Sequence, residues 1–145
     1  MTELSFPPGY LPDLYGQISS LAAVLGGFAV AALTVLLTAS PEKRVASWAS
    51  GASAFAAGSL IAATFLSAII STDAGKRNAT TFGELTPDVI PLLTYQGVLF
   101  PLGLYALLLS LGLCGWIRSK RTGIATTVAA LTGAIGVTAG FVATA

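Results

Sequence analysis

Histidine is absent from this sequence, and charged residues are scarce. Seven Lys and Arg and six Asp and Glu occur among 145 residues, about 9% in all, whereas a soluble domain has about a quarter. Intramembrane proton relays, haem ligation, zinc hydrolysis and histidine-assisted nucleophilic catalysis need groups that the long apolar runs lack. The single cysteine, Cys114, excludes an intramolecular disulfide and a cysteine-cluster metal site. We therefore expect no enzyme activity, no metal, no cofactor and no nucleic-acid partner.

The charges that are present leave four windows without any charge. These windows span 14–41, 45–72, 89–117 and 122–145, and each has 24 to 29 residues. A helix that rises about 1.5 Å per residue needs roughly 20 residues to cross a hydrocarbon core of about 30 Å. The sequence therefore predicts an all-α integral membrane protein with a single domain over 1–145. We expect a four-transmembrane-helix bundle in the lipid bilayer, with helices at about 15–39, 46–71, 91–117 and 122–144.

The connecting segments differ in length and composition. Residues 1–14 contain three prolines and several apolar and aromatic residues, which predicts a non-helical tail at the membrane interface. Residues 42–44 and 118–121 form tight turns, whereas the polar segment 73–88 has room for structure of its own. Pro101 lies within the third helix and should kink it.

Orientation follows from the distribution of Lys and Arg. The two tight turns share one face of the membrane and carry five cationic residues, whereas the loop on the opposite face carries Lys76 and Arg77. Cytoplasmic loops are enriched in Lys and Arg. We therefore expect a multi-pass protein of the cell membrane, with turns 42–44 and 118–121 in the cytoplasm and both termini outside.

Small and weakly polar residues recur at helical spacing within the spans. Steps of three and four place them on one face of each helix, where they let helix backbones approach closely. In the second helix the stripe is Ser50, Ser53, Ala57, Leu60, Thr64, Ser67 and Ser71; in the fourth it is Thr122, Ala125, Ala129, Thr132, Gly136, Ala139 and Ala143, with Gly136 and Gly140 as a small-xxx-small pair. The third helix has Gln96, Gly103 and Ser110 at intervals of seven, with Gln96 close enough to Asp88 to reach the interface. Such stripes serve either as packing seams or as a weakly polar permeation path.

Four short segments, one in each helix and in order, resemble the Orai family of calcium channels. Leu25-Gly26-Gly27-Phe28-Ala29 is similar to Leu-Ser-Gly-Phe-Ala in the pore-lining first helix of that family. Ala68-Ile69-Ile70-Ser71-Thr72 resembles Leu-Met-Ile-Ser-Thr, and Leu113-Cys114-Gly115-Trp116-Ile117-Arg118 resembles Leu-Cys-Trp-Val-Lys with one added glycine. Ile124-Ala125-Thr126-Thr127 resembles Ile-Ala-Ser-Thr-Thr. Together these segments cover under a fifth of the chain.

The resemblance implies a pore lined by the first helix, and it also has clear departures. The implied pore-lining residues are Ser20, Val24, Gly27, Phe28, Ala31 and Val35. Val35 stands where the family has the acid that selects calcium, and a valine offers no oxygen ligand to a hard cation. The basic stretch before the family's first helix is missing, and the family keeps both termini in the cytoplasm. If the kinship holds, calcium selectivity has been lost.

Two functions are compatible with these observations, and a third is less favoured. The first is a homo-oligomeric pore or ion channel with the first helix lining the passage. The second is a non-catalytic accessory subunit of a larger membrane complex, which docks other membrane subunits through its outer loop and proline-rich tail. The third is an enzyme that acts at the membrane interface through the loop charges Asp73, Lys76, Arg77, Glu84 and Asp88. A solvated loop with loosely paired charges explains these residues more simply.

Overall fold

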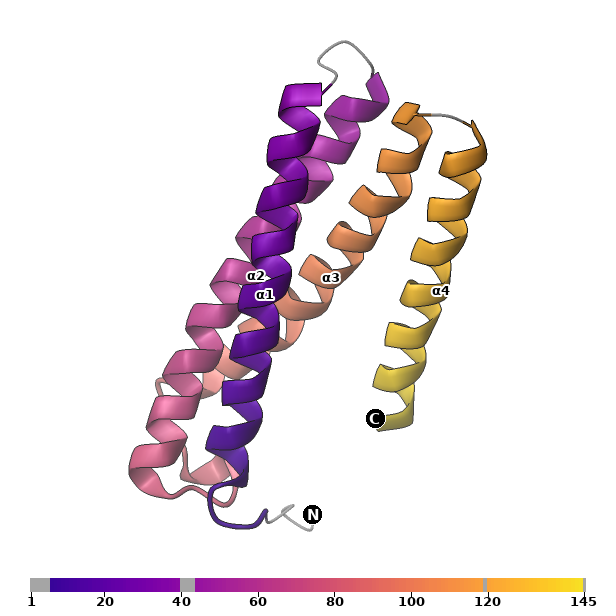
Figure 1. Ribbon diagram of the computed structural model, residues 1–145. Helices are drawn as coiled ribbons and strands as arrows, with labels where there is room; N and C mark the ends of the chain where they lie inside the picture. Colours follow the sequence, from indigo (N-terminus) through magenta and orange to yellow (C-terminus); the bar gives the residue numbers. More distant parts are fainter. Residues whose placement is uncertain (1–5, 40–43, 119, 145) are drawn as a thin grey trace.

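A computed structural model describes residues 6–39, 44–118 and 120–144, and these residues form four long helices (Figure 1). The helices are α1 (Tyr10–Ala39), α2 (Arg44–Arg77), α3 (Ile90–Arg118) and α4 (Lys120–Thr144). Each is long and apolar enough to cross a membrane. The predicted all-α architecture with four membrane-spanning helices is therefore confirmed.

The first helix begins at Tyr10, so residues 10–14 are helical and not part of an extended tail. Pro12 lies in the first turn, where a backbone N–H has no acceptor within the helix, so its missing N–H costs nothing there. Gly9 precedes the helix with φ of +85°, a conformation that glycine adopts without strain. The prediction of a non-helical tail was wrong for residues 10–14. It counted the prolines but did not consider that a proline in the first turn is compatible with a helix.

The second helix is also longer than expected and continues through Asp73 to Arg77. Its 34 residues correspond to about 51 Å, well beyond a hydrocarbon core of about 30 Å. Charged residues are tolerated in these last turns because the turns project past the hydrocarbon. The predicted 73–88 loop is therefore reduced to residues 78–89, which include a short 3₁₀ helix, η1 (Phe82–Glu84).

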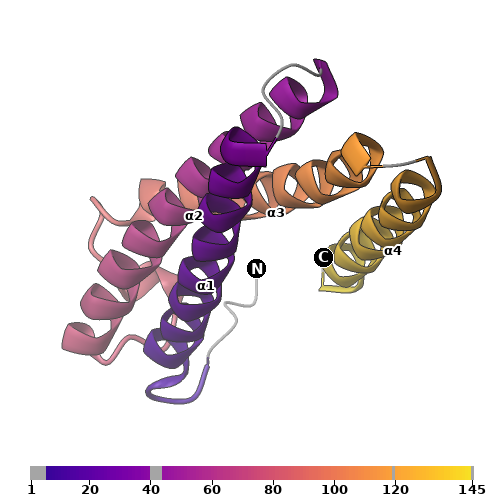
Figure 2. The ribbon, with the colours of Figure 1, turned by 45° about the horizontal axis from the view of Figure 1, so that its top comes forward.

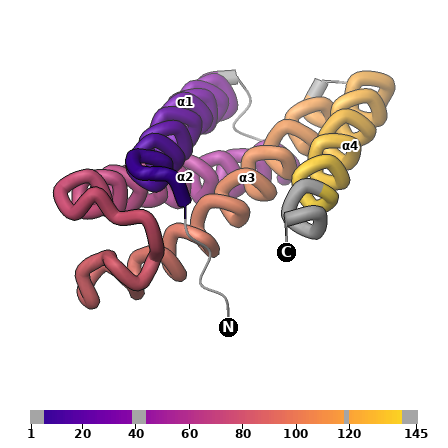
Figure 3. The backbone as a smooth tube through the Cα atoms, turned by 90° about the horizontal axis from the view of Figure 1, so that it is seen from below, coloured from indigo at the N-terminus to yellow at the C-terminus, as the bar shows by residue number. Residues whose placement is uncertain are grey.

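The helices pack in chain order, α1 on α2, α2 on α3 and α3 on α4. The edge helices, which end this packing order, are α1 and α4. Figures 2 and 3 show the α1–α2 pair on one side of the molecule and α4 on the other, with α3 between them. The bundle is therefore open, and both edge helices leave most of their surface uncovered by the protomer.

Small residues make up much of the core. Where α1, α2 and α3 meet, the buried residues are Ala29, Ala56, Ala57, Leu60 and Leu107. Lipid provides no hydrophobic drive between helices, so close backbone approach and van der Waals contact hold such interfaces together. A second cluster of Leu11, Ala74, Ala79 and Leu85 joins the start of α1 to the loop after α2.

Candidate functional site

One face of α1 is uncovered along most of the helix. The six residues predicted to line a passage, Ser20, Val24, Gly27, Phe28, Ala31 and Val35, are all exposed in the protomer. On the opposite face Ala22 and Ala29 are fully buried, and Leu36 is 8% exposed. The helix thus uses one face for packing within the protomer and presents the other to its surroundings.

The uncovered face of α1 is polar at the end where the helix begins. Asp13 and Gln17 precede Ser20 at steps of four and three, so they extend the same face, and both are exposed. They line a hollow of about 550 Å³. The Ser20 hydroxyl donates to the Gly16 carbonyl at 3.0 Å, so its hydrogen bond is formed within α1.

The uncovered face is apolar at its other end. There Phe28, Ala31 and Val35 border a hollow of about 690 Å³, whose far wall includes Leu107 and Leu111 of α3. The face therefore changes from polar to apolar along α1.

The α2–α3 seam pairs residues at matching intervals of seven. The Ser53 and Ser110 hydroxyls hydrogen-bond to each other, and a Cβ placed on Gly103 would lie 2.8 Å from Cγ of Leu60. Since the helices run antiparallel, the next step of seven along each helix brings Ser67 opposite Gln96. The stripe predicted from sequence on α2 lies mainly along this seam, with Ser53, Ala57 and Ser67 buried and Ser50 and Thr64 partly buried. Its last member, Ser71, instead donates to the Pro12 carbonyl of α1 at 2.9 Å.

The polar residues of the seam are satisfied to different degrees. The Ser67 hydroxyl is buried without a hydrogen-bond partner among the described residues. Gln96 is 6% exposed, so its side chain lies inside the protomer and does not extend to the interface as its sequence position suggested. The seven-residue spacing with Gly103 and Ser110 explains this burial, because it turns Gln96 toward α2.

The contacts of α4 use Thr122, the first residue of its predicted stripe, and Thr126, which lies off that stripe. The Thr126 hydroxyl donates to the Gly112 carbonyl at 3.2 Å, and the Thr122 hydroxyl donates to the Gly115 carbonyl at 2.9 Å. Gly136 is exposed, and a Cβ there would meet nothing within 4 Å. The surroundings of Gly140 lie outside the described part of the chain. Gly112 and Gly115, three residues apart on α3, are the sequence feature that could have predicted this close contact between α3 and α4.

Two carboxylates, Asp73 in the last turns of α2 and Glu84 in η1, hold the loop that follows α2. Asp73 accepts hydrogen bonds from the backbone N–H and the hydroxyl of Thr86, at 2.9 and 2.7 Å, and pairs with Arg77 at 3.3 Å. Glu84 accepts from the backbone N–H groups of Thr80 and Thr81, which holds the pKa of its carboxyl below the ordinary value. These two acids of the proposed interfacial acid–base set therefore serve the loop's structure.

The N-terminal segment packs against the same loop. The backbone N–H of Phe6 donates to the Thr80 carbonyl at 2.8 Å. The Phe6 ring stacks on Tyr10 and meets the edge of Phe82, with ring centroids 5.2 and 5.8 Å apart. Tail and loop form one continuous surface at this end of the molecule.

Comparisons with protein-family models, curated proteins and solved structures find no match for this chain. The resemblance to the Orai family stays a prediction that rests on its four short segments. Among the described residues, no group of three or more His, Cys, Asp or Glu could hold a metal ion. The apolar helices identify the chain as a multi-pass membrane protein.

Proposed function

We propose that several copies of this chain assemble into a membrane pore lined by α1. The observation that carries the proposal is the uncovered face of α1, which holds all six residues expected to line the passage. The opposite face is the one that packs inside the protomer, through residues such as Ala22 and Ala29. Nothing in the protomer would have to move away to expose this face to a passage.

The polar end of the uncovered face favours contact with water or protein over contact with lipid. Gln17 and Ser20 lie about 10 to 15 Å along the helix from Tyr10, close to or within the hydrocarbon. Polar side chains at that depth usually face the interior of a bundle or a water-filled cavity. A passage lined by α1 would give these side chains water, and Asp13 would stand at its mouth.

The open packing order also supports an assembly around α1. With α1 at one edge and α4 at the other, copies that meet through α1 would place α2 and α3 in a surrounding layer and α4 at the periphery. The distribution of Lys and Arg then sets the direction. The turns between α1 and α2 and between α3 and α4 face the cytoplasm, and the Asp13 mouth opens outside.

Cysteine scanning in lipid bilayers tests the proposal. In a Cys114→Ala background, Ser20→Cys, Gly27→Cys and Ala31→Cys should each make the conductance sensitive to a charged thiol reagent. Ile135→Cys is the control, because Ile135 is 68% exposed on the peripheral helix α4. A purified protein without conductance, or equal block at all four positions, would remove the pore from consideration.

A second candidate function is that of an accessory subunit, and the joined tail and loop favour it. Their shared surface presents Tyr10 and Phe82 at 45% and 41% exposure, and aromatic residues are enriched in the centres of protein interfaces. Under this hypothesis a different polypeptide should co-purify at fixed stoichiometry. Replacing both Tyr10 and Phe82 by Ala should release it, whereas a pure homo-oligomer would count against this role.

A further inference from the structure

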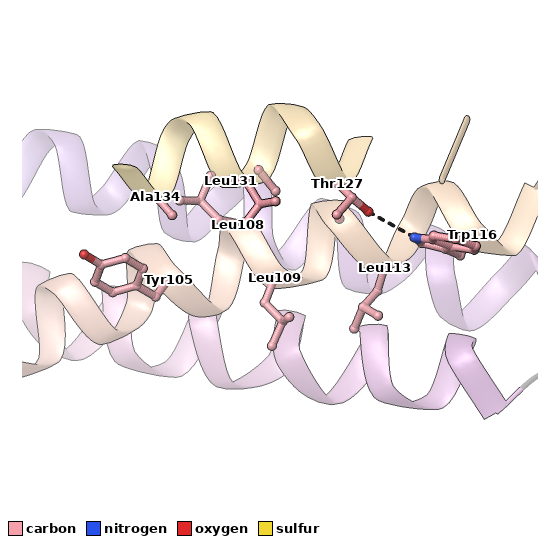
Figure 4. Close-up of a pocket in the computed structure, with 10 residues that line it drawn as sticks. Tyr105, Leu108, Leu109, Leu113, Trp116, Thr127, Leu131 and Ala134 are labelled. Carbon is pink, nitrogen blue, oxygen red and sulfur yellow. Dashed lines mark hydrogen bonds between the residues drawn. The ribbon is translucent and has the colours of Figure 1, made fainter. Parts of the chain in front are cut away.

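Two hollows adjoin along α3, between α2 and α4, and are together called the groove. The first, about 390 Å³, lies between α3 and α4 (Figure 4). The second, about 600 Å³, lies between α2 and α3. Both are bordered by Tyr105, Leu109 and Leu113 of α3, so the two hollows meet along these side chains, with α2 on one side and α4 on the other.

The groove is lined mainly by apolar side chains, and its polar groups other than the Ser47 hydroxyl take part in hydrogen bonds. The Trp116 indole N–H donates to the Thr127 hydroxyl at 3.0 Å, the contact drawn in Figure 4. The Tyr105 hydroxyl lies 2.7 Å from the Thr138 hydroxyl. These two bonds connect α3 to α4 at either end of the first hollow. Apart from Ser47, the lining left for an occupant is hydrocarbon.

The length of the groove matches one leaflet of a bilayer. Its residues on α3 run from Leu102 to Trp116, about 21 Å at 1.5 Å per residue. Half of a hydrocarbon core is about 15 Å, with the interfacial region beyond it. An acyl chain that enters at the Trp116 end would therefore lie in the groove over its full depth.

The mouth of the groove is basic. On α2, Arg44 precedes Trp48, Gly51 and Phe55 at steps of four, three and four, which places it on the groove face of that helix. On α4, Lys120 precedes Thr127, Leu131 and Ala134 at steps of seven, four and three, which places it on the groove face there. The first turns of α2 and α4 lie at the same end of the molecule (Figure 1). Both cations are exposed, and neither forms an ion pair with a described residue.

Aromatic residues mark the same end as a membrane interface. Trp48 and Trp116, which border the groove, are 75% and 46% exposed. Tryptophan is enriched at the level of the lipid headgroups. From this combination of an apolar groove, interfacial indoles and two flanking cations, we propose that the groove binds an anionic phospholipid. Its acyl chains lie over Gly51 and Leu109, and its phosphate faces Arg44 and Lys120. This site does not depend on pore formation.

Native mass spectrometry of the purified protein, titrated with phosphatidylglycerol or phosphatidylcholine, tests the headgroup contacts. Phosphatidylglycerol should bind more tightly, and Arg44→Gln and Lys120→Gln should each weaken it about fivefold, as expected for loss of one charge near anionic lipid. Lys76→Gln removes a charge at the opposite end and should leave the affinity within about twofold. Equal binding of the two lipids, or equal loss in all three variants, would overturn the proposal.

A matched pair of glycine variants tests the groove itself. Gly51 lines the groove and Gly58 does not, although both are exposed on α2 and a Cβ at either meets nothing within 4 Å. Gly51→Leu should fill the groove and weaken phosphatidylglycerol about tenfold or more, whereas Gly58→Leu should not. Unchanged lipid binding in Gly51→Leu would refute the site. Loss of oligomer mass in that variant, with no lipid bound to the parent protein, would instead assign the groove to a second copy of the chain.

Discussion

Gly103→Ala should destabilise the bundle, because Leu60 has no room to retreat from an added methyl group. A Cβ on Gly103 would lie 2.8 and 3.0 Å from Cγ and Cδ2 of Leu60, whereas carbon atoms in good contact are about 3.5 to 4.0 Å apart. Leu60 is fully buried. On the other side of Leu60, Gly26 of α1 is so close that a Cβ added there would lie 3.5 Å from the Leu60 Cβ. The leucine is thus confined between α1 and α3.

The expected change in the free energy of unfolding of Gly103→Ala follows from two opposing effects. Overpacking of a well-filled core costs about 1 to 3 kcal/mol, and replacing a helical glycine by alanine gains up to about 1 kcal/mol. Gly97→Ala is the matched control, since it lies on the same helix and its Cβ would meet nothing within 4 Å. The free energy of unfolding of Gly103→Ala should therefore fall about 1 to 3 kcal/mol below that of Gly97→Ala.

Reversible unfolding by sodium dodecyl sulfate in mixed micelles, followed by circular dichroism, measures this difference. A double-mutant cycle with Leu60→Ala adds a second check. The methyl group at position 103 should cost less when Leu60 has been shortened, with a coupling energy of about 0.5 to 3 kcal/mol. Equal stability of the two glycine variants, or strict additivity in the cycle, would refute the proposed α2–α3 register.

Three further predictions concern the seam, the loop and the orientation. Ser53→Ala should lower the free energy of unfolding by about 0.6 to 1.7 kcal/mol in the same assay, because it removes the interhelical hydrogen bond to Ser110. Ser67→Ala should be neutral or stabilising, because that hydroxyl has no partner among the described residues. An equal loss of stability in both variants would contradict this assignment. The pKa of Glu84 is lowered from 4.5 in the folded protein. The contribution of the Glu84 carboxylate to loop order is therefore fully present above pH 4.5 and is lost as the pH falls through the lower pKa of the folded state. The protection of residues 78–89 against hydrogen exchange, corrected for the intrinsic pH dependence of amide exchange, should therefore fall in acid. Glu84→Ala, which removes the acceptor, should show low protection already at neutral pH. A variant that keeps the parent's pH profile of protection would contradict this role. In a Cys114→Ala background, Thr80→Cys should react with an impermeant thiol reagent added outside intact cells, and labelling from the cytoplasm alone would reverse the orientation.

The spans were predictable from sequence because the bilayer imposes a simple physical rule. Charge is excluded from hydrocarbon, so windows such as 45–72 could be read directly. The helix ends were less predictable, since they depend on local partners. The second helix continues through Asp73 because Arg77 and Thr86 satisfy that carboxylate, and Thr86 is distant in sequence.

The interhelix faces were predictable in part. The spacing of Gln96, Gly103 and Ser110 predicted one face of α3, and the structure turns all three toward α2 as buried residues. Small residues alone do not say which neighbour a helix has. The helix α4 packs on α3 and hydrogen-bonds to it through Thr122, the first residue of the predicted stripe, and Thr126, which lies off it. The later described residues of the stripe, Gly136 among them, are exposed. The lipid groove needed the structure, since it joins residues from three helices.

The mass of the native particle in lipid nanodiscs is the most direct test of assembly through the uncovered face of α1. The proposed pore predicts a particle that contains several copies of the 14.6 kDa chain and no other polypeptide. It also predicts that a bulky polar residue in that face, such as Gly27→Gln, shifts the mass toward the single chain. A particle with the mass of one chain, or one whose mass requires a different polypeptide, would contradict the account.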